Sequence, residues 1–216
     1  MNIGILGSGN VGRTLGELWA KAGHHVMFSF SRHPERLEQL VQQIGRNARS
    51  GTPAEAANFG EVVLLAPNFW LVQEVIAQAG SLAGKIVIDT TNPYGWKDDG
   101  SMIRLVSENT SGAETILKSM PGAKLVKAYS SFQPSALLER ADRSPEQRLA
   151  VSIAGNDVEA KAIVAQLAED SGGRPFDLGS LHNARLMEIP GPFSLSDGLT
   201  LDAALALREQ VLAGTS

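Results

Sequence analysis

Short, continuously apolar runs alternate with longer stretches of helical periodicity along most of the chain. The apolar runs predict strands at 2–6, 26–30, 62–66, 86–89, 125–128, 149–154 and 174–177. Helical spacing predicts helices over 10–22, 34–47, 70–80, 111–119 and 157–170, with a short extra helix after Thr52. Strands that are apolar throughout are typical of a sheet covered on both faces. The pattern therefore predicts an α/β fold with a doubly wound, mainly parallel sheet.

The strand–helix alternation stops near the C-terminus. A Gly-, Pro- and Ser-rich run over 188–198 precedes an apolar-rich helix expected at 199–212. We therefore expect a main domain over 1–185 and a short helical extension over 186–216. Because the main sheet already has enough helices to cover it, the apolar face of the extension is expected to form a homodimer across a two-fold axis.

Composition excludes several classes of function. The chain has 216 residues, 43% of them hydrophobic, and a formal net charge of −4 with no block of Lys or Arg, so neither nucleic acid nor a membrane is an expected partner. It contains no cysteine, which excludes disulfides and thiolate metal sites, and no metal is expected. The first residues enter a strand without the layout of a signal peptide, so a cytoplasmic location is expected.

The motif with the clearest chemistry is "ILGSGNVGRTLG", in which Gly7, Gly9 and Gly12 follow a strand and open a helix. In a G-x-G-x-x-G turn the first glycine allows the tight bend and the second lets a pyrophosphate approach the backbone. The third brings the helix close to the strand. The free N–H groups and the dipole at the start of this helix favour an anion. Ser8, Asn10 and Val11 complete the predicted phosphate cradle. The main domain is therefore predicted to be a dinucleotide-binding Rossmann domain.

The stretch "FSFSRHPER" (28–36) indicates which dinucleotide binds. An NAD enzyme presents an acid to the ribose 2′-hydroxyl at the end of the second strand, and this chain has Ser31 and Arg32 there, with Arg36 one helical turn on. Guanidinium groups offer the fork of donors that a phosphate accepts. We therefore predict NADP (NADPH) as the cofactor. The alternative is that Ser31 caps the next helix and the arginines are ordinary surface residues.

Loops beyond the carboxyl ends of the central strands should hold the nicotinamide and the second substrate. The cofactor side is predicted to include Ala66, Pro67, Asn68, Asn92 and Pro93, and the substrate side Tyr129, Ser130, Ser131 and His182. Trp70 and Trp96 could stack on a flat ring or belong to the core or a lid. No residue is assigned a catalytic role, because hydride transfer between two rings needs mainly orientation.

The motifs "GILGSGNVG", "SRHPER", "TTNPYG" and "DLGSLHNARLME", in this order, resemble the NADPH reductases that exchange hydride with the deazaflavin coenzyme F420. The resemblance runs from residue 1 to about 190 and implies that Ser31, Arg32 and Arg36 bind the 2′-phosphate. It implies an NADP-dependent oxidoreductase acting on a small-molecule or cofactor substrate, with F420, a flavin or a related ring as acceptor. Two alternatives stay open: an imine reductase resembling pyrroline-5-carboxylate reductase, and a non-enzymatic NADPH-binding sensor.

Overall fold

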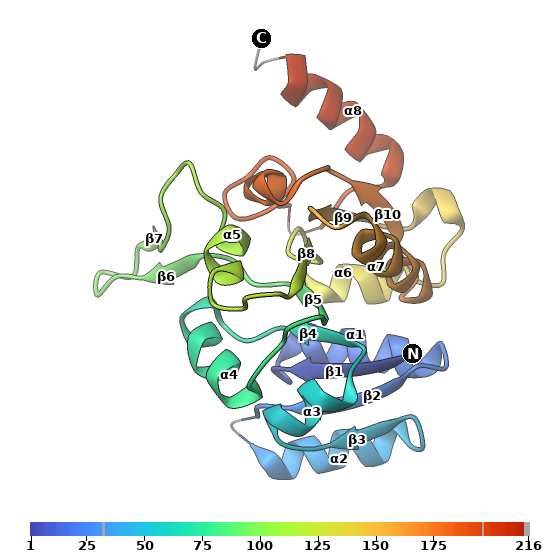
Figure 1. Cartoon of the computed structure of the whole chain (residues 1–216). Helices are drawn as coiled ribbons and strands as arrows, with labels where there is room; N and C mark the ends of the chain where they lie inside the picture. The colour runs from blue at the N-terminus through green and yellow to red at the C-terminus, as the bar shows by residue number, and fades with distance from the viewer. Residues whose placement is uncertain (32, 196, 214–216) are drawn as a thin grey trace.

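The computed structural model describes residues 1–31, 33–195 and 197–213. These residues form a central sheet in the order β10-β9-β8-β5-β4-β1-β2-β3, with helices on both faces (Figure 1). Its strands are β1 (Asn2–Leu6), β2 (His25–Ser29), β3 (Ala48–Ser50), β4 (Val62–Leu65), β5 (Ile86–Asp89), β8 (Lys124–Ala128), β9 (Ala150–Gly155) and β10 (Arg174–Asp177). Neighbouring strands are parallel except for β8 and β9. The predicted doubly wound, mainly parallel Rossmann sheet is confirmed.

The predicted helices are present with shifted ends. They are α1 (Asn10–Lys21), α2 (Pro34–Ile44), α3 (Pro53–Phe59), α4 (Val72–Ala79), α5 (Gly112–Leu117), α7 (Val158–Asp170) and α8 (Leu201–Ala213). The sequence analysis missed α6 (Pro134–Arg140), the edge strand β3 and a hairpin of β6 (Tyr94–Trp96) and β7 (Met102–Arg104). Short 3-10 turns are η1 (Phe69–Leu71), η2 (Pro145–Gln147) and η3 (Leu181–Leu186). None of the described helices is long and apolar enough to cross a membrane.

Each central strand buries side chains on both faces of the sheet. On β4, Val62 and Leu64 join the core cluster under α1 and α7, whereas Val63 and Leu65 join the cluster under α3, α4 and α5. Because successive side chains point to opposite faces, a strand between two helical layers needs an unbroken apolar run. This is the physical reason that "VVLL" has no polar alternation.

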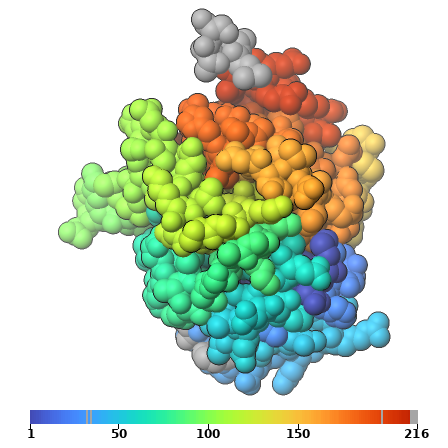
Figure 2. All heavy atoms as spheres, in the orientation of Figure 1, coloured from blue at the N-terminus to red at the C-terminus, as the bar shows by residue number. Residues whose placement is uncertain are grey.

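The strand order contains a switch point near the centre of the sheet, between β1 and β4. The chain crosses from β1 to β2 on one side and returns to β4 on the other side of β1, so the loops after β1 and β4 separate at the carboxyl edge. Ligands of doubly wound folds bind at such a switch point. The hairpin β6–β7 and helix α8 stand away from the body of the molecule (Figures 1 and 2).

Candidate active site

The glycine turn between β1 and α1 has the geometry that its sequence predicts. Gly7 has φ +114° and donates its N–H to the Ser29 carbonyl at 3.2 Å. A Cβ on Gly12 would lie 1.9 Å from the Gly7 carbonyl oxygen, so this glycine lets α1 sit close to the turn. A Cβ on Gly9 would meet nothing within 4 Å. Gly9 is therefore not required by the fold, and the open space over it suits an approaching pyrophosphate.

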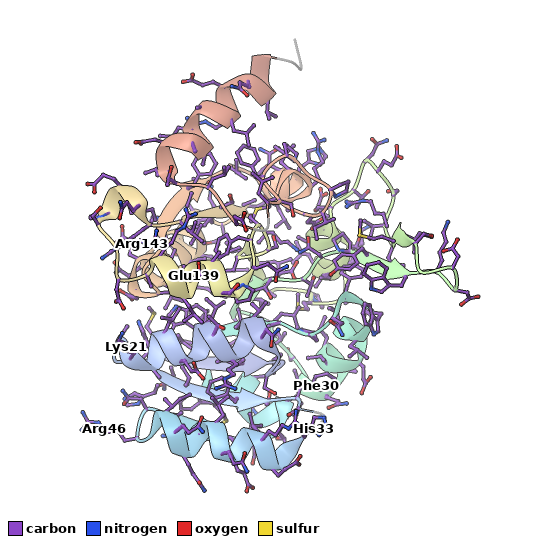
Figure 3. The ribbon with its side chains drawn as sticks, turned by 180° about the vertical axis from the view of Figure 1, so that it is seen from behind. Lys21, Phe30, His33, Arg46, Glu139 and Arg143 are labelled. Carbon is purple, nitrogen blue, oxygen red and sulfur yellow. The ribbon has the colours of Figure 1, made fainter. Side chains whose placement is uncertain are left out.

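A cavity of about 420 Å³ extends from this turn toward α2. Ser8, Arg13, Phe30, Ser31, His33 and Arg36 contribute to its wall. Phe30 and His33 lie at the end of the sheet opposite to Lys21 and Arg46 (Figure 3). No Asp or Glu among the described residues lines this cavity. The Ser31 hydroxyl also accepts the His33 N–H at 3.1 Å, which orders the chain just before α2. Arg32, predicted to bind the 2′-phosphate, lies outside the described residues.

A second cavity, of about 740 Å³, continues from the first toward the β8 loop, and we call it the crevice. Both cavities are lined by Gly9, Asn10, Ala66, Pro67 and Asn68, so they form one groove across the carboxyl ends of β1 and β4. The crevice is also lined by Val11, Trp70, Thr91, Asn92, Tyr94, Tyr129, Ser130, Ser131, Ile189 and Leu195. The structure thus brings the predicted cofactor-side and substrate-side loops to one groove.

Tyr129 and Ser131 differ sharply in how their side chains are used. The Tyr129 hydroxyl donates to the Leu167 carbonyl at 3.0 Å and lies 3.1 Å from Ser171 Oγ, so it points into the core. Burial raises the pKa of this phenol well above its usual range, and the group is not placed to supply a proton. Ser131 is 4% exposed, and its buried hydroxyl has no hydrogen-bond partner among the described residues. A buried hydroxyl on the crevice wall that lacks a partner suits a ligand that supplies one.

Among the described residues, three of the predicted site residues line neither cavity of the groove. Gly12 lies beneath the glycine turn, and Pro93 is buried. His182 lies on η3 with its side chain 52% exposed, and its Nδ1 is 3.4 Å from Glu114 Oε1. Trp96 is also outside the wall, on the exposed hairpin, whereas Trp70 lies at the mouth with 53% of its surface exposed.

The far wall of the crevice is the segment 187–195, which we call the C-terminal wall. Asn92 joins it to the β8 loop, because its amide donates to the Ser130 carbonyl at 3.1 Å and accepts the Ile189 N–H at 2.9 Å. The Ser130 hydroxyl donates to the Met187 carbonyl at 3.2 Å. Asn92 and Ser130 were predicted as ligand contacts; they line the crevice, but these hydrogen bonds use their side chains to hold its wall.

Sequence reasoning missed a buried charge cluster behind the crevice. Lys127 is 0% exposed, and its ammonium lies 2.9 Å from Asp89 Oδ2 and 3.3 Å from Glu188 Oε1. It also donates to the Thr91 carbonyl, while the other Asp89 oxygen accepts the Thr91 N–H and hydroxyl at 2.8 and 2.7 Å. The sequence signal for this cluster was the second lysine of the otherwise apolar strand "KLVKA", because a buried charge needs charged or polar partners nearby.

The described residues of the groove fit a dinucleotide, and the crevice offers little acid–base chemistry. No Asp, Glu, His, Lys or Arg among the described residues lines the crevice. Nor does any group of acidic or histidine side chains in the described part of the chain have the arrangement needed to hold a metal ion. The crevice is therefore suited to binding and orienting a ligand rather than to moving protons.

Residues 2–93 match the family model described as NADP oxidoreductase, coenzyme F420-dependent. The F420-dependent NADP reductase of Methanocaldococcus jannaschii is 30% identical over 64% of this chain and 62% of that protein. A crystal structure of a putative F420-dependent NADP-reductase from Arthrobacter sp. FB24 is 29% identical, with a TM-score of 0.75 over 85% of this chain and 86% of that one. These similarities support an F420-oxidoreductase-like Rossmann family for this chain. The resemblance seen in the sequence motifs is thereby confirmed.

A second kind of relative shares the same domain. Metalloreductase STEAP3 of Rattus norvegicus is 31% identical over 186 residues, which are 86% of this chain and 35% of that protein. The chain thus spans about a third of the length of these metalloreductase relatives. One relative is named a metalloreductase and another an F420-dependent NADP reductase, which supports an NADP-dependent oxidoreductase.

Proposed function

We propose that the protein is an NADPH-dependent reductase that passes hydride from NADPH to a deazaflavin such as F420, a flavin or a related flat ring. The observation that carries the proposal is the continuous groove. The glycine turn and Arg36 lie at one end of it, and the crevice, whose described lining has no Asp or Glu, lies at the other. The open space over Gly9 and the unpartnered Ser131 hydroxyl both suit a bound ligand. When bound, NADPH would supply the hydride, as a redox cofactor does in such folds.

In the proposed reaction the chain's own residues bind and orient. The N–H groups after Gly9 and the α1 dipole would hold the pyrophosphate, and Ser31, Arg32 and Arg36 the 2′-phosphate. Asn68 and Ser131 would fix the nicotinamide end, with Trp70 at the mouth of the crevice. Since holding two reactants in the productive geometry can supply much of the rate of a bimolecular step, such a site needs no side-chain acid.

Rapid mixing tests the proposed acceptor class. The protein and NADPH are mixed with F420, FMN, FAD or a cyclic imine, and the loss of NADPH absorbance is followed in a single turnover. We expect oxidation by at least one of the flat rings and none by the imine. Oxidation by the imine alone would instead support the second enzyme class, and NADPH binding without turnover of any acceptor would support the sensor.

Cofactor choice gives a first prediction. NADPH is expected to bind more tightly than NADH, and Arg32→Ala or Arg36→Ala to reduce NADPH affinity about ten- to a hundredfold by removing a charge-assisted contact to phosphate. NADH affinity should change little in either variant. Fluorescence titration of both nucleotides measures this. Arg46→Ala is the matched control, since Arg46 lies at the opposite end of the sheet from His33 (Figure 3). Equal affinities for NADPH and NADH in the wild type would contradict the assignment.

Quaternary structure gives a second prediction, a homodimer with α8 at the interface. Helix α8 contacts β10 and stands away from the body (Figure 2). Its partly exposed apolar side chains, which a second copy would bury further, are Leu201, Leu205, Leu207 and Val211. Light scattering at micromolar concentration should report a dimer, and Leu205→Arg should yield a folded monomer by circular dichroism. Glu139→Arg, on α6, should remain dimeric; a monomeric wild type would refute the interface.

A further inference from the structure

The hairpin β6–β7, which is separate from the main sheet, contributes a residue to the wall of the crevice. Its strands pair antiparallel with Tyr94 directly opposite Arg104, and Tyr94 lines the crevice. Residues 96–103 of the hairpin are exposed, and the hairpin stands away from the body (Figure 2). Because so little of the hairpin is buried, the placement of Tyr94 depends on the few contacts made at its base.

Arg104 links that base to the body of the domain through its side chain. Its Nη1 donates to the Ile189 carbonyl at 3.2 Å, and its Nη2 donates to the Thr110 carbonyl at 3.0 Å and to Glu188 Oε2 at 3.3 Å. Ile189 lines the crevice as part of the C-terminal wall. One guanidinium thus joins the strand opposite Tyr94 to the wall that contains Ile189.

Glu188 is a fixed anchor for this contact. It is 0% exposed, and its carboxylate accepts the N–H groups of Gly112 at 2.9 Å and Ala113 at 3.1 Å, at the start of α5. The Lys127 ammonium lies 3.3 Å from Glu188 Oε1. Since these partners belong to α5 and β8, the carboxylate is held by the body of the domain, and Arg104 brings the hairpin to it.

We propose that Arg104 is a positioning residue that sets the separation between Tyr94 and Ile189, and with it the size of acceptor that the crevice admits. The residue touches neither the groove over Gly9 nor the α2 side, so its effect is confined to the acceptor end. This inference rests on the proposed function, because it assigns the acceptor to the crevice. The forked shape of the guanidinium is needed for this positioning as well as its charge. Its two terminal nitrogens donate to two carbonyls and one carboxylate, which a single ammonium cannot reach in the same geometry.

Arg104→Met and Arg104→Lys test the proposal, with Lys97→Met as the control that removes a cation from the same hairpin away from the crevice. For Arg104→Met we expect the acceptor KM to rise about tenfold, with kcat within about threefold and the NADPH Kd unchanged. Arg104→Lys should recover part of the KM, and Lys97→Met should match the wild type. Hydrogen exchange should become faster both at 94–96 and at 187–191 in Arg104→Met, because Arg104 lies on the strand paired with 94–96 and contacts Glu188 and Ile189.

The outcomes separate this inference from the proposed function. An unchanged KM in Arg104→Met, or equal rises in KM and NADPH Kd, overturns the positioning role. If the wild type reduces no ring of the panel, the proposed function fails and hydrogen exchange alone decides. In that case faster exchange at both segments supports the coupling of hairpin and wall, and faster exchange at 94–96 alone overturns it.

Discussion

Gly9→Val is expected to leave the fold intact while weakening NADPH binding about ten- to a hundredfold. Gly9 has φ −72° and ψ −168°, which any residue adopts, and a Cβ there would meet nothing within 4 Å. The added side chain would instead occupy the space proposed for the pyrophosphate, and overlap of this kind costs about 1–3 kcal/mol. Thermal unfolding measures the first effect and nucleotide titration the second.

Gly12→Ala is the matched comparison for Gly9→Val. Its Cβ would lie 1.9 Å from the Gly7 carbonyl oxygen, so either the turn or α1 must shift. We therefore expect a lower melting temperature for Gly12→Ala and an unchanged one for Gly9→Val. If Gly9→Val binds NADPH as tightly as the wild type does, the pyrophosphate does not lie over this turn and the proposed orientation of the dinucleotide is wrong.

The largest effect on stability is expected at Lys127. Lys127→Met would leave Asp89, which is 0% exposed, without its cation, whereas Glu188 would keep its contact with Arg104. Removing one partner of a buried ion pair typically costs about 3–5 kcal/mol in the free energy of unfolding, because the remaining charge is neither hydrated nor paired. Urea denaturation followed by circular dichroism measures this loss.

Two companion variants test the cause of the Lys127 effect. Lys124→Met removes a lysine from the first position of the same strand, where it pairs with Asp157 at 2.9 Å near the surface, and should lose much less stability. Adding Asp89→Asn to Lys127→Met neutralises the carboxylate that is left without a cation and should restore part of the stability. Equal losses in Lys124→Met and Lys127→Met would show that burial of the charge does not decide the effect.

The elements that could be predicted from sequence are those whose local pattern matches their environment. The strands β1, β4, β5 and β8 are buried on both faces, so their largely apolar sequences indicate that helices cover both sides of the sheet. The hairpin strands "YGW" and "MIR" are short and largely exposed, and no periodicity distinguishes them from a loop. The sequence also cannot show that β9 runs antiparallel to β8, because both directions bury the same residues.

The candidate site was predictable where a motif determines backbone shape and not where tertiary contacts decide. The glycine turn and the loops after β4, β5 and β8 meet in one groove, as the rule for doubly wound folds requires. The run "EIPGPFSLSDG" indicated a loop but not that it forms the far wall, because Gly and Pro specify turns and not partners. The roles of Asn92 and Arg104 depend on hydrogen bonds across 97 and 85 residues of chain, which no local pattern contains.

The order of the strands also bears on how copies of this protein can meet. The sheet ends at β3 and β10, and open edges of this kind are templates for pairing with the edge of another molecule. Here β3 is only three residues long and includes Arg49, while β10 contains Pro175, which has no N–H to donate. Both edges are therefore poor templates for continuing the sheet into a neighbour or a fibril. The proposed dimer through α8 would therefore form by side-chain packing, in which complementarity of shape selects the partner.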